Sequence, residues 1–241
     1  MKISIVVPAF NEERLLGVSL TGIKSAAGAL MGIGWEVELI VCDNNSTDRT
    51  AEIAREAGAT IVFEPVNQIA RARNRGASVA TGDWLIFVDA DSHPSPELFA
   101  DVAKQIRSGK YFAGGATVRL DERHFVAGCI TRLWNLASRS RRLLAGSFIF
   151  IEAAVFREIG GFSHELFVAE ELELSQRLKR LARQTGKQMV ILHRHPLVTS
   201  ARKMRLYTMG EHLRFLLRAV FNQRRALTSR KEAYLWYDGR R

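Results

Sequence analysis

Cysteine, proline and long apolar runs are all scarce in this sequence. Its 241 residues include two cysteines and five prolines, and no stretch approaches the 18 or more apolar residues of a membrane-spanning helix. Cys42 and Cys129 lack the spacing of metal ligands, and Cys42 falls in an apolar run. We therefore expect reduced thiols and a cytoplasmic location. Because no linker, low-complexity tract or internal repeat divides the chain, the composition favours one globular domain with a full core.

Acidic residues are scarce near the C-terminus. Residues 194–241 hold 12 Lys/Arg and 3 Asp/Glu, and so account for nearly all of the net charge of +10. In this part apolar residues recur at helical spacing, with arginines on another face, which predicts a basic amphipathic helical extension over residues 203–241. Such a helix either packs on the core with a solvated basic side or makes peripheral contact with an anionic membrane, here the inner face of the cell membrane. Nucleic acid is the less favoured anion, because the sequence has no zinc-finger spacing and no RNP-type aromatic motif.

Two carboxylates follow a hydrophobic run in the first half of the chain. Residues 84–88 (WLIFV) are typical of a strand buried on both faces, and Asp89 and Asp91 come directly after it. Open α/β sheets bind ligands at the carboxyl ends of their strands. Mg²⁺ and Mn²⁺ typically bind one or two carboxylates together with a substrate's phosphates. The pair is therefore a candidate metal site, and the alternative is a strand end that simply faces water.

Three more apolar runs are typical of strands, and polar groups follow each of them: residues 3–7, 37–42 and 60–63. Asn11 is expected to cap a helix whose first turn contains Glu12 and Glu13. Residues 43–50 offer carboxylates and amides, and residues 67–76 form a basic helical turn. Because strands alternate with helices, the pattern predicts an α/β fold with a mostly parallel sheet flanked by helices.

The order of these segments resembles the family 2 glycosyltransferases of the GT-A fold. The matching segments are residues 7–13 (VPAFNEE), 43–48 (DNNSTD), 72–76 (ARNRG), 89–91 (DAD) and, later, 160–162 (GGF) with 170–174 (EELEL). The resemblance covers roughly residues 1–200. It implies a GT-A, Rossmann-like αβα sandwich with a helical C-terminal extension. Residues 1–110 would be the nucleotide-sugar-binding half, residues 111–202 the acceptor and catalytic half, and residues 203–241 the extension.

The resemblance also implies a donor and a cofactor, namely a nucleoside-diphosphate sugar with Mn²⁺ or Mg²⁺ on its diphosphate. Asp91 is the first choice for a metal ligand and Asp89 shares metal and ribose contacts. His195, preferred over His193, is a candidate third ligand whose alternative interpretation is a polar strand-end histidine. The resemblance assigns nucleotide-sugar contacts to Pro8, Ala9, Phe10, Glu12, Asp43, Asn45, Arg71, Arg73, Asn74, Asp89, Ala90, Asp91, Ser200 and Arg202.

Family 2 enzymes invert the anomeric carbon, which requires one general base and no protein nucleophile. Glu171 occupies the place of the family's usual aspartate and is the first candidate for this base; Glu170 is the second. The acceptor is expected to carry a hydroxyl, as a glycan, a lipid-linked sugar or a small molecule. It would be anionic if Arg139, Arg141 and Arg142 bind it, and those arginines are exposed helix charges otherwise.

Two other classes of function remain as alternatives. A sugar-phosphate nucleotidyltransferase would share the αβα plan and the metal chemistry, but should carry a Gly-rich phosphate loop after the first strand. The sequence has Pro8-Ala9-Phe10-Asn11 there instead. A non-catalytic basic module that binds nucleotides or nucleic acid would account for the C-terminal charge and leave the ordered acids at the strand ends unexplained.

Overall fold

The computed structural model describes residues 1–122, 125–202, 206, 227–230 and 237. The predicted extension over residues 203–241 therefore lies almost wholly outside the described residues, and its helical, amphipathic character stays a prediction.

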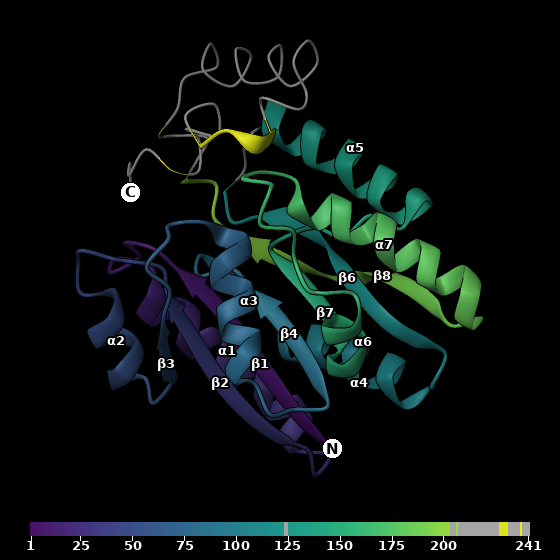
Figure 1. Ribbon diagram of the computed structural model, residues 1–241, viewed down its shortest axis with the longest axis horizontal. Coiled ribbons are helices and arrows are strands. Elements are labelled where there is room, and N and C mark those ends of the chain that lie inside the picture. The colour runs from purple at the N-terminus through teal and green to yellow at the C-terminus, as the bar shows by residue number, and fades with distance from the viewer. Residues whose placement is uncertain (123–124, 203–205, 207–226, 231–236, 238–241) are drawn as a thin grey trace.

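The described strands form one sheet with the order β3-β2-β1-β4-β7-β6-β8-β5 (Figure 1). The strands are β1 (Lys2–Ala9), β2 (Glu36–Asp43), β3 (Thr60–Phe63), β4 (Trp84–Val88), β5 (Ser92–His93), β6 (Tyr111–Leu120), β7 (Phe148–Glu152) and β8 (Gln188–Thr199). Strands β1 to β4 are parallel, and β6 is parallel to β8. Strand β7 runs antiparallel between β4 and β6, and β5 runs antiparallel to β8. The predicted α/β fold with a mostly parallel sheet is confirmed.

Helices cover both faces of this sheet and divide the core into two layers. The helices are α1 (Leu16–Met31), α2 (Thr50–Glu56), α3 (Ile69–Val79), α4 (Pro96–Arg107), α5 (Phe125–Arg141), α6 (Ala153–Glu158) and α7 (Glu170–Thr185). One apolar cluster joins the sheet to α1 and α4, and the other joins it to α3, α6 and α7. Strand β4 serves both, because successive side chains of a strand point to opposite faces: Ile86 and Val88 belong to the first cluster, Leu85 and Phe87 to the second. This burial on two sides explains why its sequence is an unbroken hydrophobic run.

The first helix begins later than the sequence predicted. Helix α1 starts at Leu16 and has no acidic residue in its first turn, so the prediction that Asn11 caps it ahead of Glu12 and Glu13 is wrong. Asn11 has a left-handed backbone with φ 51°, and its side-chain oxygen accepts a hydrogen bond from the Thr47 amide at 2.8 Å. Asparagine side chains readily bond to nearby backbone in this way, and this one ties the end of β1 to the loop after β2.

Both cysteines are unpaired, with Cys42 buried in β2 and Cys129 exposed on α5. Among the helices of the described ranges, none has the length and hydropathy needed to cross a bilayer.

Candidate active site

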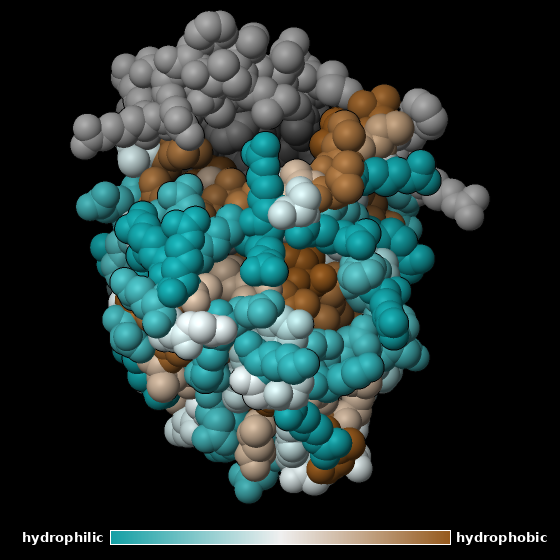
Figure 2. All heavy atoms as spheres, turned by 90° about the vertical axis from the view of Figure 1, so that its right-hand side faces the viewer, coloured by the Kyte–Doolittle hydropathy of each residue, from teal (hydrophilic) through white to brown (hydrophobic). Residues whose placement is uncertain are grey.

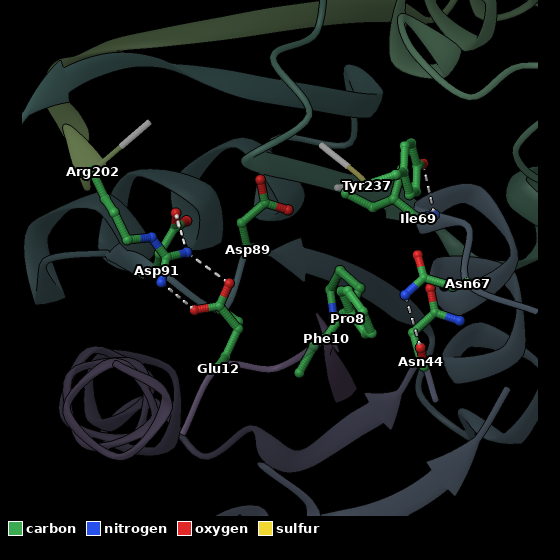
Figure 3. Close-up of a pocket in the computed structure, with 12 residues that line it drawn as sticks. Pro8, Phe10, Glu12, Asn44, Asn67, Ile69, Asp89, Asp91, Arg202 and Tyr237 are labelled. Carbon is green, nitrogen blue, oxygen red and sulfur yellow. Dashed lines mark hydrogen bonds and ion pairs between the residues drawn. The ribbon is translucent and has the colours of Figure 1, made fainter. Parts of the chain in front are cut away.

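A small pocket lies at the carboxyl ends of β1, β2 and β4 (Figure 3). Its volume is about 80 Å³. The sequence predicted most of its lining, namely Pro8, Ala9, Phe10, Glu12, Asp89, Ala90, Asp91 and Arg202; Asn44, Asn67, Ile69 and Tyr237 complete it. Strand β1 ends beside β2 and β4 in parallel register, so the loops after the three strands meet at one edge. The strand-end acids are therefore brought together where an α/β sheet binds its ligands.

Arg202 reaches the acidic end of this pocket from the segment that follows β8. Its guanidinium donates to both carboxylate oxygens of Glu12, at 2.7 and 2.8 Å, and one of its nitrogens lies 3.6 Å from Asp91 Oδ2 (Figure 3). The Ser200 amide donates to the Asp91 carbonyl oxygen at 3.1 Å, which fixes this segment against β4. A planar guanidinium matches a carboxylate as well as it matches a phosphate. The site thus holds a cation beside two carboxylates.

Arg73 is the buried centre of the site, with an exposed fraction of 1%. Its terminal nitrogens lie 2.9 Å from Asp89 Oδ1, 2.5 Å from Glu170 Oε1 and 2.8 Å from the carbonyl oxygen of Gly146. Its Nε atom has no hydrogen-bond partner among the described residues. The flanking carboxylates raise the pKa of Arg73 despite its burial, so the guanidinium stays charged. One arginine therefore joins Asp89, after β4, to Glu170, the first residue of α7.

Glu170 and Glu171 occupy different surroundings although they are adjacent. Glu170 is buried against Arg73, whereas Glu171 is only half-buried. Burial and, after it, the neighbouring Glu170 charge raise the pKa of Glu171 to about 8, against the opposing effect of Arg73. Burial also raises the pKa of Glu170, and Arg73 opposes that shift. Since Glu170 is engaged by Arg73, Glu171 is the more accessible proton acceptor of the two.

Arg73 and Asn74, two of the predicted donor contacts, do not line the pocket. Arg73 is behind Asp89, as described above. The Asn74 side chain donates to the carbonyl oxygen of Phe162 and accepts from its amide, at 2.8 and 2.9 Å. Asn74 thereby holds the turn at Gly160 and Gly161, whose φ angles are 77° and 69°. In the structure, Arg73 and Asn74 of the ARNRG segment link separate parts of the protein chain.

Three other predicted donor contacts, Asp43, Asn45 and Arg71, are also absent from the lining. Asp43 accepts from the Ser46 amide at 2.9 Å, and Arg71 donates to Gln68 Oε1 at 3.1 Å. Asn45 has a left-handed φ of 66°. Ser200 contributes through its backbone, and its hydroxyl accepts from the Arg202 amide at 3.2 Å.

His195 is not brought to the aspartates. Its Nδ1 atom lies 3.0 Å from Asp101 Oδ2 of α4, and neither His195 nor His193 lines the pocket. The described residues contain no group of three or more His, Cys, Asp or Glu side chains that could hold a metal ion. In the structure His195 therefore makes a polar contact between β8 and α4.

The sequence motifs did not predict four residues of the pocket lining, namely Asn44, Asn67, Ile69 and Tyr237. Asn44 donates to the carbonyl oxygens of Glu64 and Val66 and accepts from the Gln68 amide. Its position inside the polar cluster after β2 was the one available signal. The Tyr237 hydroxyl accepts from the Ile69 amide at 3.2 Å and donates to the Phe167 carbonyl oxygen at 3.0 Å. It lies 168 positions from Ile69, and no motif around it indicates this contact.

Asp89 and Asp91 nevertheless suit a divalent cation, because hard cations need few protein ligands when a substrate supplies phosphates. Both aspartates line the pocket, and each lies near an arginine, Arg73 or Arg202. Two carboxylates at a pocket edge match the donor set of Mg²⁺ or Mn²⁺. Arg202 would have to leave Asp91 before that carboxylate could bind a metal in its place.

The fold and this site together define an α/β domain of the GT-A class, with acidic groups at the carboxyl ends of parallel strands. Residues 4–158, more than half of the chain, match the family described as Glycosyl transferase family 2. The chain belongs to this family.

Relatives and solved structures agree with that assignment. A dolichol-phosphate mannosyltransferase of Pyrococcus furiosus is 32% identical over 124 residues, which are 48% of this chain and 33% of the relative. The structure of S. aureus TarS 1–349 has a TM-score of 0.64 at 19% identity, and the match covers 98% of this chain and 68% of that one. A mannosyltransferase from Pyrobaculum calidifontis in complex with GDP-Man and Mn²⁺ has a TM-score of 0.68 at 19% identity, covering 90% and 60%. The structures show the shared fold, and this chain spans about a third of the Pyrococcus relative.

Proposed function

We propose that this chain transfers a sugar from a nucleoside-diphosphate sugar to a hydroxyl acceptor, with inversion at the anomeric carbon and with Mn²⁺ or Mg²⁺ on the diphosphate. The observation that carries the proposal is the Arg73 bridge, which joins the strand-end Asp89 to Glu170, the residue before Glu171. A leaving diphosphate and an attacking hydroxyl need these two kinds of acid on opposite sides of the sugar carbon.

On the donor side, Pro8, Phe10, Asn44 and Asn67 surround the part of the pocket that would take the nucleoside. Asp89 and Asp91 would hold the metal ion, which when bound neutralises charge on the departing diphosphate. Arg202 would exchange its carboxylate partners for phosphate oxygens when the donor enters. Arg202 would thus have a partner in both states, Glu12 without the donor and phosphate with it.

On the acceptor side, Glu171 takes the proton of the attacking hydroxyl. A base works best when its pKa lies near the working pH, and burial raises the pKa of Glu171 to about 8. Glu170 does not compete for this role, because its carboxylate is held by the Arg73 guanidinium at 2.5 Å. It positions the first turn of α7 and, through it, Glu171.

Neighbours of similar fold support the donor and the metal in this proposal. The Pyrobaculum calidifontis structure contains GDP-Man and Mn²⁺, and a TarS structure contains UDP-GlcNAc. The division into a donor half (1–110) and an acceptor half (111–202) is proposed on the same basis. The acceptor class is left as any molecule that presents a hydroxyl, lipid-linked acceptors included.

The test is a screen for slow donor hydrolysis, which needs no acceptor. The protein is incubated with UDP-, GDP- and dTDP-sugars with Mn²⁺, with Mg²⁺ or with EDTA, and release of the nucleoside diphosphate is measured. We expect release from one class of donor that requires the metal and is lost in Asp91→Ala. The matched control is Asp101→Ala, an aspartate outside the pocket that contacts His195. Activity unchanged by EDTA and by Asp91→Ala would refute the metal assignment, and pyrophosphate release from a nucleoside triphosphate would refute glycosyl transfer.

A further inference from the structure

Helix α5 presents large apolar side chains to solvent along one side. Val126, Ile130, Leu133 and Leu136 are 43, 55, 68 and 64% exposed, and their spacing of three and four residues places them on one stripe. We call these four residues the α5 stripe. Isolated exposed leucines are ordinary, whereas a contiguous stripe marks an interaction surface.

The side of α5 that faces the protein is the more polar one. The Asn135 side chain accepts from the Val118 amide and donates to the Val118 carbonyl oxygen of β6, at 3.0 and 2.8 Å. Ser138 is fully buried, and its hydroxyl donates to the Leu143 carbonyl oxygen at 2.6 Å. The helix is therefore fixed to β6 by its polar groups while its leucines point away from the core. A helix that only needed to pack on this sheet would have the opposite arrangement.

Arginines accompany the α5 stripe along the same helix. Residues 125–142 contain four arginines and no acidic residue: Arg132, Arg139, Arg141 and Arg142. The end of α5 meets α7 across a cleft lined by Arg141, Arg142, Lys179, Arg183 and Lys187. Burial lowers the pKa of Lys179, and the Arg141 and Arg183 charges lower it further, so this cluster is crowded with like charge. In Figure 2, hydrophobic and hydrophilic surface lie next to each other in the upper part of the face shown.

We propose that α5 is a docking surface for anionic lipid bilayers, with the α5 stripe inserted below the headgroups and the arginines of α5 and α7 on lipid phosphates. Apolar residues on one face with Arg on its flanks are the requirements for a helix that lies in the membrane interface. A second copy of this chain fits less well. Pairing two α5 helices about a two-fold axis would bring arginines against arginines with no acidic residue of either helix between them.

The exposed Cys129 allows insertion of α5 into a bilayer to be tested without any substitution in the protein. Cys129 lies on α5 among the stripe residues and is exposed, whereas Cys42 is buried and burial raises its pKa to about 12. Because the thiolate is the reactive form, a fluorophore such as NBD should label Cys129 alone. Vesicles of phosphatidylcholine with 30% phosphatidylglycerol should blue-shift and brighten the label, and pure phosphatidylcholine should not. The matched control carries the label at position 18 instead (Val18→Cys with Cys129→Ser), on α1, where Val18 is 67% exposed.

Co-sedimentation with the same vesicles measures the affinity. Binding to anionic vesicles should exceed binding to neutral ones at least tenfold, since each arginine contact changes binding about fivefold at low salt. The triple variant Ile130→Ser, Leu133→Ser, Leu136→Ser should lose about tenfold or more, while Val18→Ser should bind like the parent. These positions are exposed, and a thermal melt checks that each variant is folded.

Three results would overturn the proposal. The first is the absence of vesicle binding at low salt. The second is binding that the triple variant leaves unchanged, which would assign membrane contact to another part of the chain such as residues 203–241. The third is a parent protein that is dimeric by light scattering while the triple variant is monomeric, because the α5 stripe would then be the contact with a second copy. None of these outcomes depends on the donor-hydrolysis assay, so this inference stands or falls separately from the proposed reaction.

Discussion

Removing the charge of Arg73 tests the centre of the site, and Arg73→Met does so at similar side-chain length. The guanidinium is almost fully buried and contacts Asp89, Glu170 and the Gly146 carbonyl oxygen. Breaking a buried ion pair from one side costs about 3–5 kcal/mol, because the other charge stays buried without compensation. An exposed pair contributes at most about 1 kcal/mol. We therefore expect Arg73→Met to lower the free energy of unfolding by about 3–5 kcal/mol near neutral pH.

The loss should depend on pH in a defined direction. Without Arg73, the strongest effect opposing burial is lost, and the folded-state pKa of Glu170 rises further above the value of 4.5 expected for the unfolded chain. A carboxyl group with a raised folded pKa binds more protons in the folded state, so stability falls as pH rises above 4.5 toward that folded pKa. The slope approaches about 1.4 kcal/mol per pH unit for one group. Arg73→Met should thus be closest to the parent near pH 4.5 and furthest from it at pH 8.

Urea unfolding of the parent and Arg73→Met at several pH values from 4.5 to 8 provides the measurement. Arg49→Met is the matched control, because Arg49 pairs with Glu52 on the exposed surface. Adding Glu170→Gln to Arg73→Met removes the stranded charge and should restore about 1 kcal/mol or more at pH 8, within the range of couplings between contacting residues. A cost equal to that of Arg49→Met, or one that does not change with pH, would refute the argument that Arg73 compensates buried carboxylates.

Three further predictions concern other parts of the site. Glu171→Gln should reduce the rate of sugar transfer at least about 10²-fold. The kcat/KM of the parent should rise tenfold per pH unit until about pH 8. A flat pH profile would contradict the assignment of Glu171 as the base. Gly161→Ala should cost at least about 1 kcal/mol more in urea unfolding than Gly160→Ala. Both glycines have positive φ, but only at position 161 would the new Cβ come within 2.6 Å of the Asn74 side-chain oxygen, so equal losses would argue against that contact. Arg202→Gln should raise the affinity for Mn²⁺ in the absence of nucleotide about tenfold, equivalent to ~1.4 kcal/mol, because the guanidinium no longer competes for Glu12 and Asp91. The affinity is measured by Mn²⁺ titration with electron paramagnetic resonance. An unchanged affinity would show that Arg202 does not compete with the metal.

Strands β1 to β4 were predictable from the sequence because local patterning decides them. Residues 84–88 were predicted as a strand and are β4, residue for residue. The strand-end acids were predictable for the same reason, since parallel strands deliver their carboxyl ends to one edge. The start of α1 was not predictable, because the Asn11 side chain can either cap a helix or bond to backbone elsewhere in the fold. Its side chain bonds to the Thr47 amide of a neighbouring strand end, a tertiary contact that capping statistics do not contain.

The residues predicted to contact the donor also differ in how far local sequence determines their position. Glu12 and Asp91 lie in the pocket as their motifs predicted, but Arg73 sits beneath it. An arginine on a helix beside a phosphate site has the same sequence signal whether it faces the ligand or a buried carboxylate. Its orientation is decided by Glu170, which is 97 positions away. The contact of Tyr237 with Ile69 was not predictable at all, because no sequence motif surrounds Tyr237.

The Arg73 bridge has a consequence for protein engineering. Hybrid enzymes are commonly assembled by joining the first half of one family member to the second half of another, in the hope of combining their substrate preferences. Here the proposed donor half (residues 1–110) contains Arg73 and Asp89, and the proposed acceptor half (residues 111–202) contains Glu170. A hybrid whose second half lacks an acid at the position of Glu170 would keep both substrate surfaces. Its Arg73 would nevertheless be buried at the junction without this compensating carboxylate. The compatibility of parents is therefore best judged at this one ion pair before any loop is exchanged.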